Sequence, residues 1–248
     1  MASTRLRTGL RLPARLYGFV LCAVPRGEHG TFLEIGGYDG VRLSNTLWLE
    51  ACYHWSGVLV EGSPFNFEAL EARSGRNRSA HVHAAASCER SGRVQFVADR
   101  DLARSGLSGV PAALDALHAG NQIAVASRIA RRGYQTVSVP CRSLESILVE
   151  HSARHLHGRE RVDFFSLDVE GAEAMVLRTV RSSRFGVVKV ETGYGHNGWN
   201  YSSKDAEVAR LLEAGGLVRV HKLTHGDGRR DHVYAAPDVL ERCGARLS

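Results

Sequence analysis

Acidic side chains stand at the ends of the apolar segments that this sequence would bury in a sheet. Asp168 ends the most apolar segment, residues 162–168, and Glu191 ends a second one, residues 187–191. Ligands of open α/β sheets bind at the carboxyl ends of the strands, so both carboxylates are candidates for catalysis. Asp168 could take a proton from an attacking hydroxyl or bind an ammonium group, and the structural alternative is capping of the next helix. His196, in a segment rich in glycine and aromatic residues, is the third catalytic candidate.

A glycine-rich turn follows another apolar segment near the start of the chain. Residues 31–40 read TFLEIGGYDG, and apolar residues then recur at helical spacing over residues 41–53. This pattern predicts a strand, a tight turn and a helix. Glycines in such a turn allow positive φ and a close approach of a ligand, which the first N–H groups of the helix would face. The turn is therefore a candidate nucleotide cradle, and the alternative is a core strand with a purely structural turn.

The spacing of glycines and acids indicates which nucleotide the turn would bind. Gly36, Gly37 and Gly40 do not fit the GxGxxG pattern of dinucleotide sites, and Asp39 would repel a pyrophosphate. S-adenosylmethionine has no phosphate and carries a sulfonium and an ammonium group. Carboxylates around the turn, such as Glu34 and Asp39, would favour these positive charges. The turn therefore predicts a site for S-adenosylmethionine.

A carboxylate at the end of the next strand supports the same cofactor. The apolar residues 58–60 lead into Glu61, which lies 21 residues past Gly40. An acid in this place accepts hydrogen bonds from the ribose hydroxyls of a bound nucleotide. Tyr38, inside the turn, is also expected to contact the cofactor.

Four blocks of sequence, in order along most of the chain, resemble the FkbM family of S-adenosylmethionine-dependent methyltransferases. They are LEIGGYDG at 33–40, SNTLWLE at 44–50, WSGVLVEGSP at 55–64 and VDFFSLDVEGAE at 162–173. The resemblance implies an α/β, Rossmann-like methyltransferase fold, with a mostly parallel central sheet, a C-terminal antiparallel hairpin and helices on both faces. It also implies methyl transfer to hydroxyl oxygens of sugars or polyketide-type metabolites.

Within this fold, two further residues are expected beside the cofactor. Ser63 precedes Pro64 and should cap a helix, because a serine hydroxyl accepts from a free N–H and proline suits the first helical position. Ala85 ends the third strand, residues 80–86, where the fold places the adenine. Alternation and turn residues predict the remaining elements: strands at 94–97, 136–139, 162–168, 187–191, 217–221 and 232–236, helices at 143–149 and 204–214, and a loop at 87–92.

Two segments are candidates for the acceptor site. Residues 98–134 are rich in Ser, Gly, Ala and Arg, and such long insertions are often lids, so this one is expected to be a flap or a disordered excursion. Residues 192–201 interleave rings, glycines and amides, which suits a sugar or another planar acceptor. The alternative for this second segment is a rigid loop whose rings fold back on the core.

Composition and charge indicate one domain and no nucleic-acid partner. The 248 residues are 44% hydrophobic, enough for a single sizeable core. Of the net charge of +6, residues 1–27 contribute five arginines and no acid, so the rest of the chain carries only +1. We therefore expect a basic leader or an N-terminal helix at 1–27 and a methyltransferase domain at 28–248. The apolar run 16–24 is too short for a membrane span, which needs about 20 residues.

Neither the cysteines nor the histidines show a metal or disulfide pattern. The five cysteines are scattered, without a CxxC pair, and predict neither a disulfide framework nor a zinc site. His151, His155 and His157 lack the acidic residue of an HExxH motif, so we expect a solvated helix end and no metal.

These features favour an enzyme that methylates a small-molecule or glycan acceptor with S-adenosylmethionine. The alternative is a domain that keeps the fold without catalysis and serves in binding or trafficking. A nicotinamide-dependent oxidoreductase is disfavoured by the glycine spacing. We expect a soluble protein, cytoplasmic or, if residues 1–27 are a transit peptide, organellar.

Overall fold

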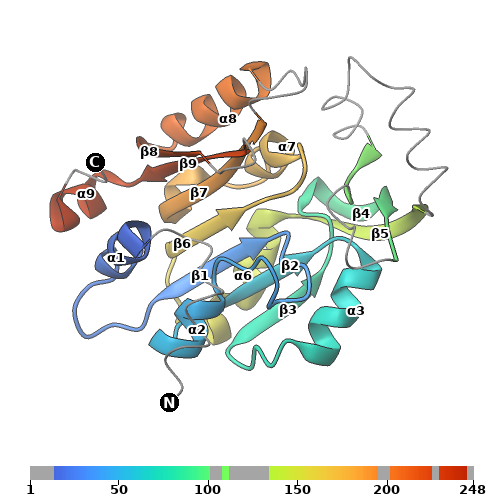
Figure 1. Cartoon of the computed structure of the whole chain (residues 1–248), viewed down its shortest axis with the longest axis horizontal. Helices are drawn as coiled ribbons and strands as arrows, with labels where there is room; N and C mark the ends of the chain where they lie inside the picture. Colours follow the sequence, from blue (N-terminus) through green and yellow to red (C-terminus); the bar gives the residue numbers. More distant parts are fainter. Residues whose placement is uncertain (1–13, 101–107, 112–133, 195–201, 225–228, 245–248) are drawn as a thin grey trace.

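A seven-stranded sheet forms the centre of the protein (Figure 1). The computed structural model describes residues 14–100, 108–111, 134–194, 202–224 and 229–244. The strand order is β3-β2-β1-β6-β7-β9-β8. The strands are β1 (Thr31–Ile35), β2 (Ser56–Glu61), β3 (Ser79–His83), β6 (Val162–Leu167), β7 (Phe185–Tyr194), β8 (Val218–Thr224) and β9 (Arg229–Ala235).

Five strands of this sheet are parallel, and the C-terminal hairpin adds the antiparallel strand. β9 lies between β7 and β8 and runs antiparallel to both. β1 pairs with β6, with Leu33 opposite Phe165, and every residue of these two strands is buried. The apolar composition of residues 162–168 correctly predicted this central position, because both faces of a central parallel strand are covered. The Rossmann-like fold class is confirmed.

Helices cover both faces of the sheet. α3 (Pro64–Arg73) and α6 (Leu144–His155) both contact β2 and β3, from opposite sides in Figure 1. α3 begins at the cap expected from Ser63, whose hydroxyl accepts from Asn66 N. α6 has a similar cap, because the Ser143 hydroxyl accepts from Ser146 N. The other α-helices are α1 (Ala14–Cys22), α2 (Leu47–Tyr53), α7 (Glu173–Leu177), α8 (Ser202–Ala214) and α9 (Pro237–Cys243).

The helix after the glycine-rich turn is shorter than its sequence pattern predicted. We expected residues 41–53, but α2 begins only at Leu47. Asp39 Oδ1 accepts from the backbone N of Val41 and Arg42, at 3.0 and 2.6 Å, which closes a turn there. Such side-chain bonds compete with the helical bonds of the backbone. Residues 41–46 therefore form a loop.

A second, two-stranded sheet lies beside the main one. β4 (Ser87–Ala98) and β5 (Gln135–Ser143) pair antiparallel, so the loop expected at 87–92 is wrong. Residues 89–92 are all exposed and mostly polar, and composition alone does not distinguish such a strand from a loop. Most of the expected insertion at 98–134 lies outside the described residues. Of its described part, Gly109 exchanges backbone hydrogen bonds with Val97.

Two disulfides correct the prediction drawn from the scattered cysteines. Cys88 joins Cys141 across β4 and β5, and Cys22 joins Cys243, with Cα atoms 5.7 Å apart. The partners are 53 and 221 residues apart in sequence, so no local spacing could reveal them. Cys52 is free and exposed.

The N-terminal helix packs as part of the core. Leu16, Tyr17, Phe19 and Val20 of α1 are buried, and α1 lies beside α9 (Figure 1). The second disulfide fixes this contact between the first and last described helices. None of the helices in the described ranges is long and apolar enough to span a membrane.

Candidate functional site

A cavity opens at the carboxyl ends of β1, β2 and β6, where ligands bind in folds of this type. Its walls come from the glycine-rich turn, the end of β2, the start of β4 and the segment after β6. Among the predicted site residues, it is lined by Glu34, Gly36, Tyr38, Glu61, Ala85 and Asp168. Residues separated by up to 134 positions in sequence thus share one cavity.

Gly36 is a position in the turn that suits only glycine. Its φ is +83°, and a Cβ there would lie 1.9 Å from the backbone oxygen of Asp168. The glycine therefore lets the ends of β1 and β6 approach each other. Both Gly36 N and Gly37 N donate to Val60 O, so these two N–H groups are already used by the protein.

Glu34 and Asp39, expected to favour a positively charged cofactor, bind the protein's own loop. Glu34 is buried in the cavity wall, and its carboxylate accepts from Ser44 Oγ at 2.7 Å, Asn45 N at 2.6 Å and Thr46 Oγ1 at 2.5 Å. Asp39 closes the turn at residues 41–42. Both acids thus shape the loop that carries Leu43 and Asn45 to the cavity.

A buried arginine fastens the same loop, and the sequence analysis missed it. Arg76 Nε lies 2.6 Å from Glu50 Oε2, and its other nitrogens donate to Gly40 O, Ser44 Oγ and Thr46 Oγ1. Residues 73–79 read as a polar turn, in which one more arginine carries no signal. Burial of an arginine with an acid from α2 is a tertiary property that local pattern does not encode.

Glu61 occupies the place expected for the ribose-binding acid. Its two oxygens accept from Tyr38 N at 2.8 Å and Ser63 N at 2.7 Å, which fixes the carboxylate at the cavity wall. Oε1 also accepts from Asn66 Nδ2 at 3.4 Å, so Oε2 is the oxygen with room for a further donor. Burial raises the pKa of Glu61 to about 7, against the lowering effect of these hydrogen bonds. The group is therefore close to its ionisation point near neutral pH.

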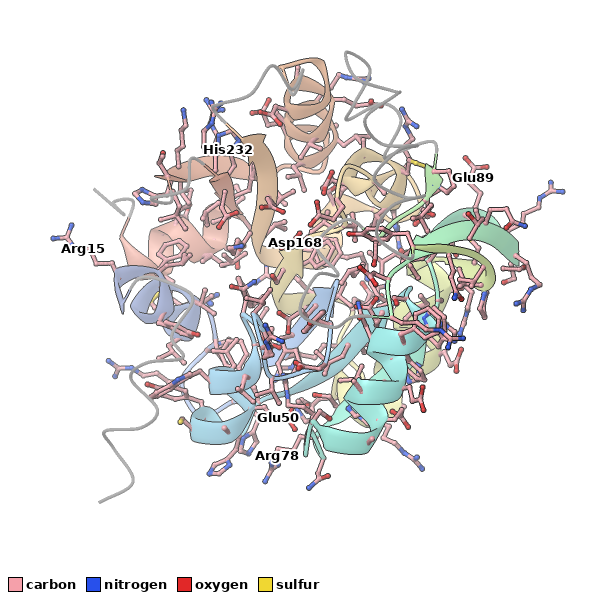
Figure 2. The ribbon with its side chains drawn as sticks, turned by 45° about the vertical axis from the view of Figure 1, so that its right-hand side comes forward. Arg15, Glu50, Arg78, Glu89, Asp168 and His232 are labelled. Atoms are coloured by element: carbon pink, nitrogen blue, oxygen red, sulfur yellow. A yellow bond between two sulfur atoms is a disulfide. The ribbon has the colours of Figure 1, made fainter. Side chains whose placement is uncertain are left out.

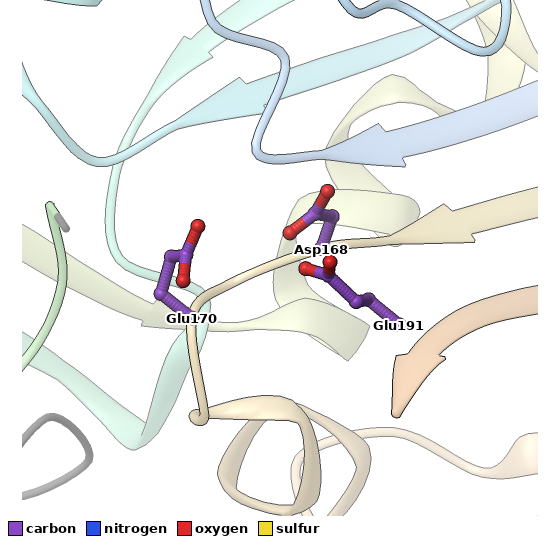
Figure 3. Close-up of side chains that lie close together, drawn as sticks. All are labelled: Asp168, Glu170 and Glu191. Carbon is purple, nitrogen blue, oxygen red and sulfur yellow. The ribbon is translucent and has the colours of Figure 1, made fainter. Parts of the chain in front are cut away.

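Three acids face one another beyond β6, as Figure 3 shows. Asp168, Glu170 and Glu191 are half-buried, and their carboxyl oxygens lie within 4.8 Å of one another, a spacing that could hold a cation. Burial, the negative charge of Asp168 and a hydrogen bond with it raise the pKa of Glu191. The two carboxyl groups are hydrogen-bonded to each other, which requires that they share a proton. In Figure 2, Asp168 lies near the middle of the molecule.

Asp168 is held against β1 by its backbone. Its N donates to Ile35 O at 3.2 Å, so the residue continues the pairing of β1 with β6. The nearby Glu173, the first residue of α7, accepts from Val169 N and Gly171 N and so closes the turn before the helix. Burial raises the pKa of Glu173 to about 7. The segment after β6 is thus fixed at both ends, with Asp168 directed to the cavity.

The remaining candidates divide between the cavity and other places. Ala85 lines the cavity and exchanges backbone hydrogen bonds with Pro140 and Arg142 of β5. Ser63 is fully buried as the cap of α3 and does not line the cavity, and neither do Gly37, Asp39 and Gly40. His196 lies outside the described residues.

The cavity suits S-adenosylmethionine in shape and chemistry. Ala84, Ala85, Ala86 and Phe96 give one wall an apolar surface for a flat ring system. Two residues that line the cavity each have a buried polar atom without a hydrogen-bond partner among the described residues. These atoms are Tyr38 Oη and Asn66 Oδ1. Buried polar atoms are normally paired, so both are available to a ligand. Tyr38 was expected from the sequence to contact the cofactor, and it lines the cavity.

A family model and several solved structures are similar to this chain. A family model described as the methyltransferase FkbM domain matches residues 34–218. None of the curated proteins matches the chain. The METTL16 methyltransferase domain is 12% identical, with a TM-score of 0.49 over 89% of this chain and 65% of that one. Aeropyrum pernix fibrillarin, solved with natively bound S-adenosyl-L-methionine, is 12% identical, with a TM-score of 0.45 over 89% of this chain and 74% of its own.

A human methyltransferase 10 domain containing protein is 9% identical, with a TM-score of 0.45 over 90% of this chain and 82% of its own. The family model covers well over half of the chain and includes the glycine-rich turn, Glu61 and Asp168. The chain therefore belongs to the FkbM family of S-adenosylmethionine-dependent methyltransferases.

Proposed function

We propose that this protein transfers the methyl group of S-adenosylmethionine to a hydroxyl oxygen of a sugar or small metabolite. The observation that carries the proposal is the hydrogen-bonded pair of Asp168, in the cavity wall, and Glu191 beside it. A hydroxyl nucleophile must lose a proton on transfer, and a carboxylate within reach can accept it. The bound cofactor supplies an electrophilic methyl group on its sulfonium.

Each residue of the site has a distinct part in this proposal. Glu61 accepts from the ribose and fixes the cofactor in the cavity. Asp168 accepts the hydroxyl proton, and Glu191 orients Asp168 through its hydrogen bond. Because transfer of this kind depends mainly on positioning, the base contributes a part of the rate, about 10²- to 10⁴-fold. His196 remains a further candidate for contact with the acceptor.

Substitution of Asp168 tests this assignment. Asp168→Asn keeps the shape of the side chain and removes the base, so turnover should fall about 100-fold or more while the affinity for S-adenosylhomocysteine changes little. Glu71→Gln, an exposed acid on α3, is the matched control. Turnover is measured as S-adenosylhomocysteine release with a panel of sugars, glycans and small alcohols, with the products identified by mass. Unchanged turnover of Asp168→Asn would remove this residue from the mechanism.

Glu191 is a positioning residue in this account, and a pair of variants tests that role. Glu191→Gln keeps a donor for Asp168 and should retain much of the turnover. Glu191→Ala removes the donor and should lose clearly more. Equal loss in both variants would mean that the hydrogen bond to Asp168 is not what Glu191 contributes.

The competing function is a binding or trafficking module that keeps the cofactor cavity without catalysis. The basic segment at 1–27 and the insertion at 98–134 motivate it. Cofactor binding with no methyl transfer to any hydroxyl, amine or thiol acceptor would favour this second function.

The two disulfides support an oxidising compartment as the place where the protein works. Disulfides persist in secretory or extracellular surroundings and are rare in the cytosol. Mass spectrometry of the protein isolated from its native cells, with free thiols alkylated before lysis, would test this. Alkylation of all five cysteines would contradict it.

A further inference from the structure

Asn66, on the first turn of α3, presents an unused acceptor to the cofactor cavity. The residue is only 3% exposed and lines the cavity beside Glu61. Its backbone N donates to the Ser63 hydroxyl, which fixes it at the start of the helix. Its Nδ2 donates to Glu61 Oε1 at 3.4 Å. Its Oδ1 is buried and has no partner among the described residues.

The hydrogen bond to Glu61 determines which way the amide faces. Glu61 presents oxygens only, and Oε1 already accepts from Ser63 N. If the amide were turned over, Asn66 Oδ1 would face these oxygens as a second acceptor, without a hydrogen between them. The amide nitrogen therefore belongs on Glu61, and the amide oxygen of this cavity-lining residue is left for another partner.

A buried acceptor at this place calls for a donor from the ligand, since buried carbonyl oxygens without partners are rare in folded proteins. The ribose of S-adenosylmethionine carries two neighbouring hydroxyl groups, and each has one proton to donate. Glu61 and Asn66 offer adjacent acceptors that are tied to each other by the hydrogen bond between their side chains. The two acceptors, on Glu61 and Asn66, therefore match the two neighbouring hydroxyl donors of the ribose.

We propose that Asn66 Oδ1 accepts a hydrogen bond from one ribose hydroxyl of S-adenosylmethionine while Glu61 accepts from the other. Recognition of the ribose is thus divided between a carboxylate and an amide. Through its donor to Glu61, Asn66 also orients the carboxylate. The inference rests on the family's cofactor and not on the class of acceptor that the protein methylates.

A double-mutant cycle between protein and ligand tests the contact. Isothermal titration calorimetry measures the affinity of wild type and Asn66→Ala for S-adenosylhomocysteine and for its 2′-deoxy and 3′-deoxy analogues. In wild type, removal of the partnered hydroxyl should weaken binding roughly tenfold, as expected for one buried hydrogen bond. In Asn66→Ala, removal of the same hydroxyl should have little further effect, because its partner is gone.

Controls separate this contact from damage to the fold. Asn77→Ala, at an exposed position after the same helix, should bind all three ligands as wild type does. Asn66→Leu, which fills the space without polar atoms, repeats the cycle if the alanine variant is unstable.

Equal losses of affinity on deleting either hydroxyl, in wild type and in both Asn66 variants, would overturn the proposal. A second result would also overturn the proposal. If the effect of Asn66→Ala depended on N6-dimethylation of the adenine and not on either ribose hydroxyl, Asn66 would contact the adenine. Calorimetry needs no acceptor, so a failed search for the methylated product would not affect this result.

Discussion

Arg76→Met should destabilise the fold strongly, because it removes the buried positive partner of Glu50. The arginine is 3% exposed, and it contacts Glu50 Oε2 at 2.6 Å, Gly40 O at 2.8 Å, Ser44 Oγ at 3.1 Å and Thr46 Oγ1 at 2.8 Å. Methionine keeps most of the length of the side chain and removes all of these donors. The carboxylate of Glu50, itself 7% exposed, then loses its positive partner.

The size of the loss follows from the burial of this pair. Removing one partner of a buried ion pair leaves an uncompensated charge and costs about 3–5 kcal/mol of unfolding free energy. A domain of this size loses roughly 2–4 °C in Tm for each kcal/mol. We therefore expect Tm to fall by about 6–20 °C.

Thermal and urea unfolding, followed by circular dichroism, measure this effect. Arg78→Met is the matched control, because Arg78 is exposed and only its backbone N contacts Glu50, at 2.8 Å. The control should lie within about 0.5 kcal/mol of wild type. If the two variants had the same stability, Arg76 would not hold the buried network that its contacts describe.

The same substitution should also weaken cofactor binding. Arg76 holds residues 40–46, and this loop carries Leu43 and Asn45 to the cavity. Affinity for S-adenosylhomocysteine, measured well below the unfolding temperature, should therefore fall in Arg76→Met and not in Arg78→Met. A destabilised variant with full affinity would show that the cavity does not depend on this anchor.

Three further predictions concern the turn, the ribose acid and the disulfide between α1 and α9. Gly36→Ala should cost about 2–5 kcal/mol of unfolding free energy, because φ is +83° and the new Cβ meets a backbone oxygen at 1.9 Å. Gly37→Ala should be nearly neutral in the same denaturation assay, because the atom nearest to its new Cβ is 3.6 Å away. Burial raises the pKa of Glu61 from 4.5 to about 7, so between these pH values the folded chain holds a proton that the unfolded chain has lost. The contribution of Glu61 to the unfolding free energy therefore falls as pH rises from 4.5 to about 7. Affinity for S-adenosylhomocysteine should instead rise as Glu61 ionises above about pH 7, and calorimetry at several pH values should show no such rise in Glu61→Gln. Cys243→Ser opens a 221-residue loop and should lower unfolding free energy by about 2–5 kcal/mol, whereas Cys52→Ser, which removes a free exposed thiol, should not.

The parts of the fold that local pattern encodes could be predicted from the sequence. A run of apolar residues that ends in Asp168 has to be buried on both faces, which places it next to β1 in the centre of the sheet. The same reasoning brought Glu61 and Asp168 to one cavity, since parallel strands end at the same edge. The cap at Ser63 needed only the chemistry of a hydroxyl before a proline.

Features that depend on tertiary partners could not be predicted in this way. Arg76 and Glu50 are 26 residues apart, and nothing in either local sequence marks them as buried. The helical periodicity of residues 41–53 predicted a helix that is present only from Leu47. Residues 41–46 are not helical, because the Asp39 side chain binds the backbone there. Glu34 and Asp39 were expected to favour the positive charges of the cofactor. Their hydrogen bonds to the loop became visible only with the three-dimensional arrangement.

The bond between Cys22 and Cys243 makes a covalent ring of nearly the whole described chain. A protease that cuts once anywhere between these two cysteines would therefore linearise the ring without releasing a fragment. Such a nicked protein would migrate as one band on a gel without reductant and as two bands with it. The same ring also keeps both halves of the sheet at high effective concentration after the cut, so nicked molecules should re-form their structure as a single unit.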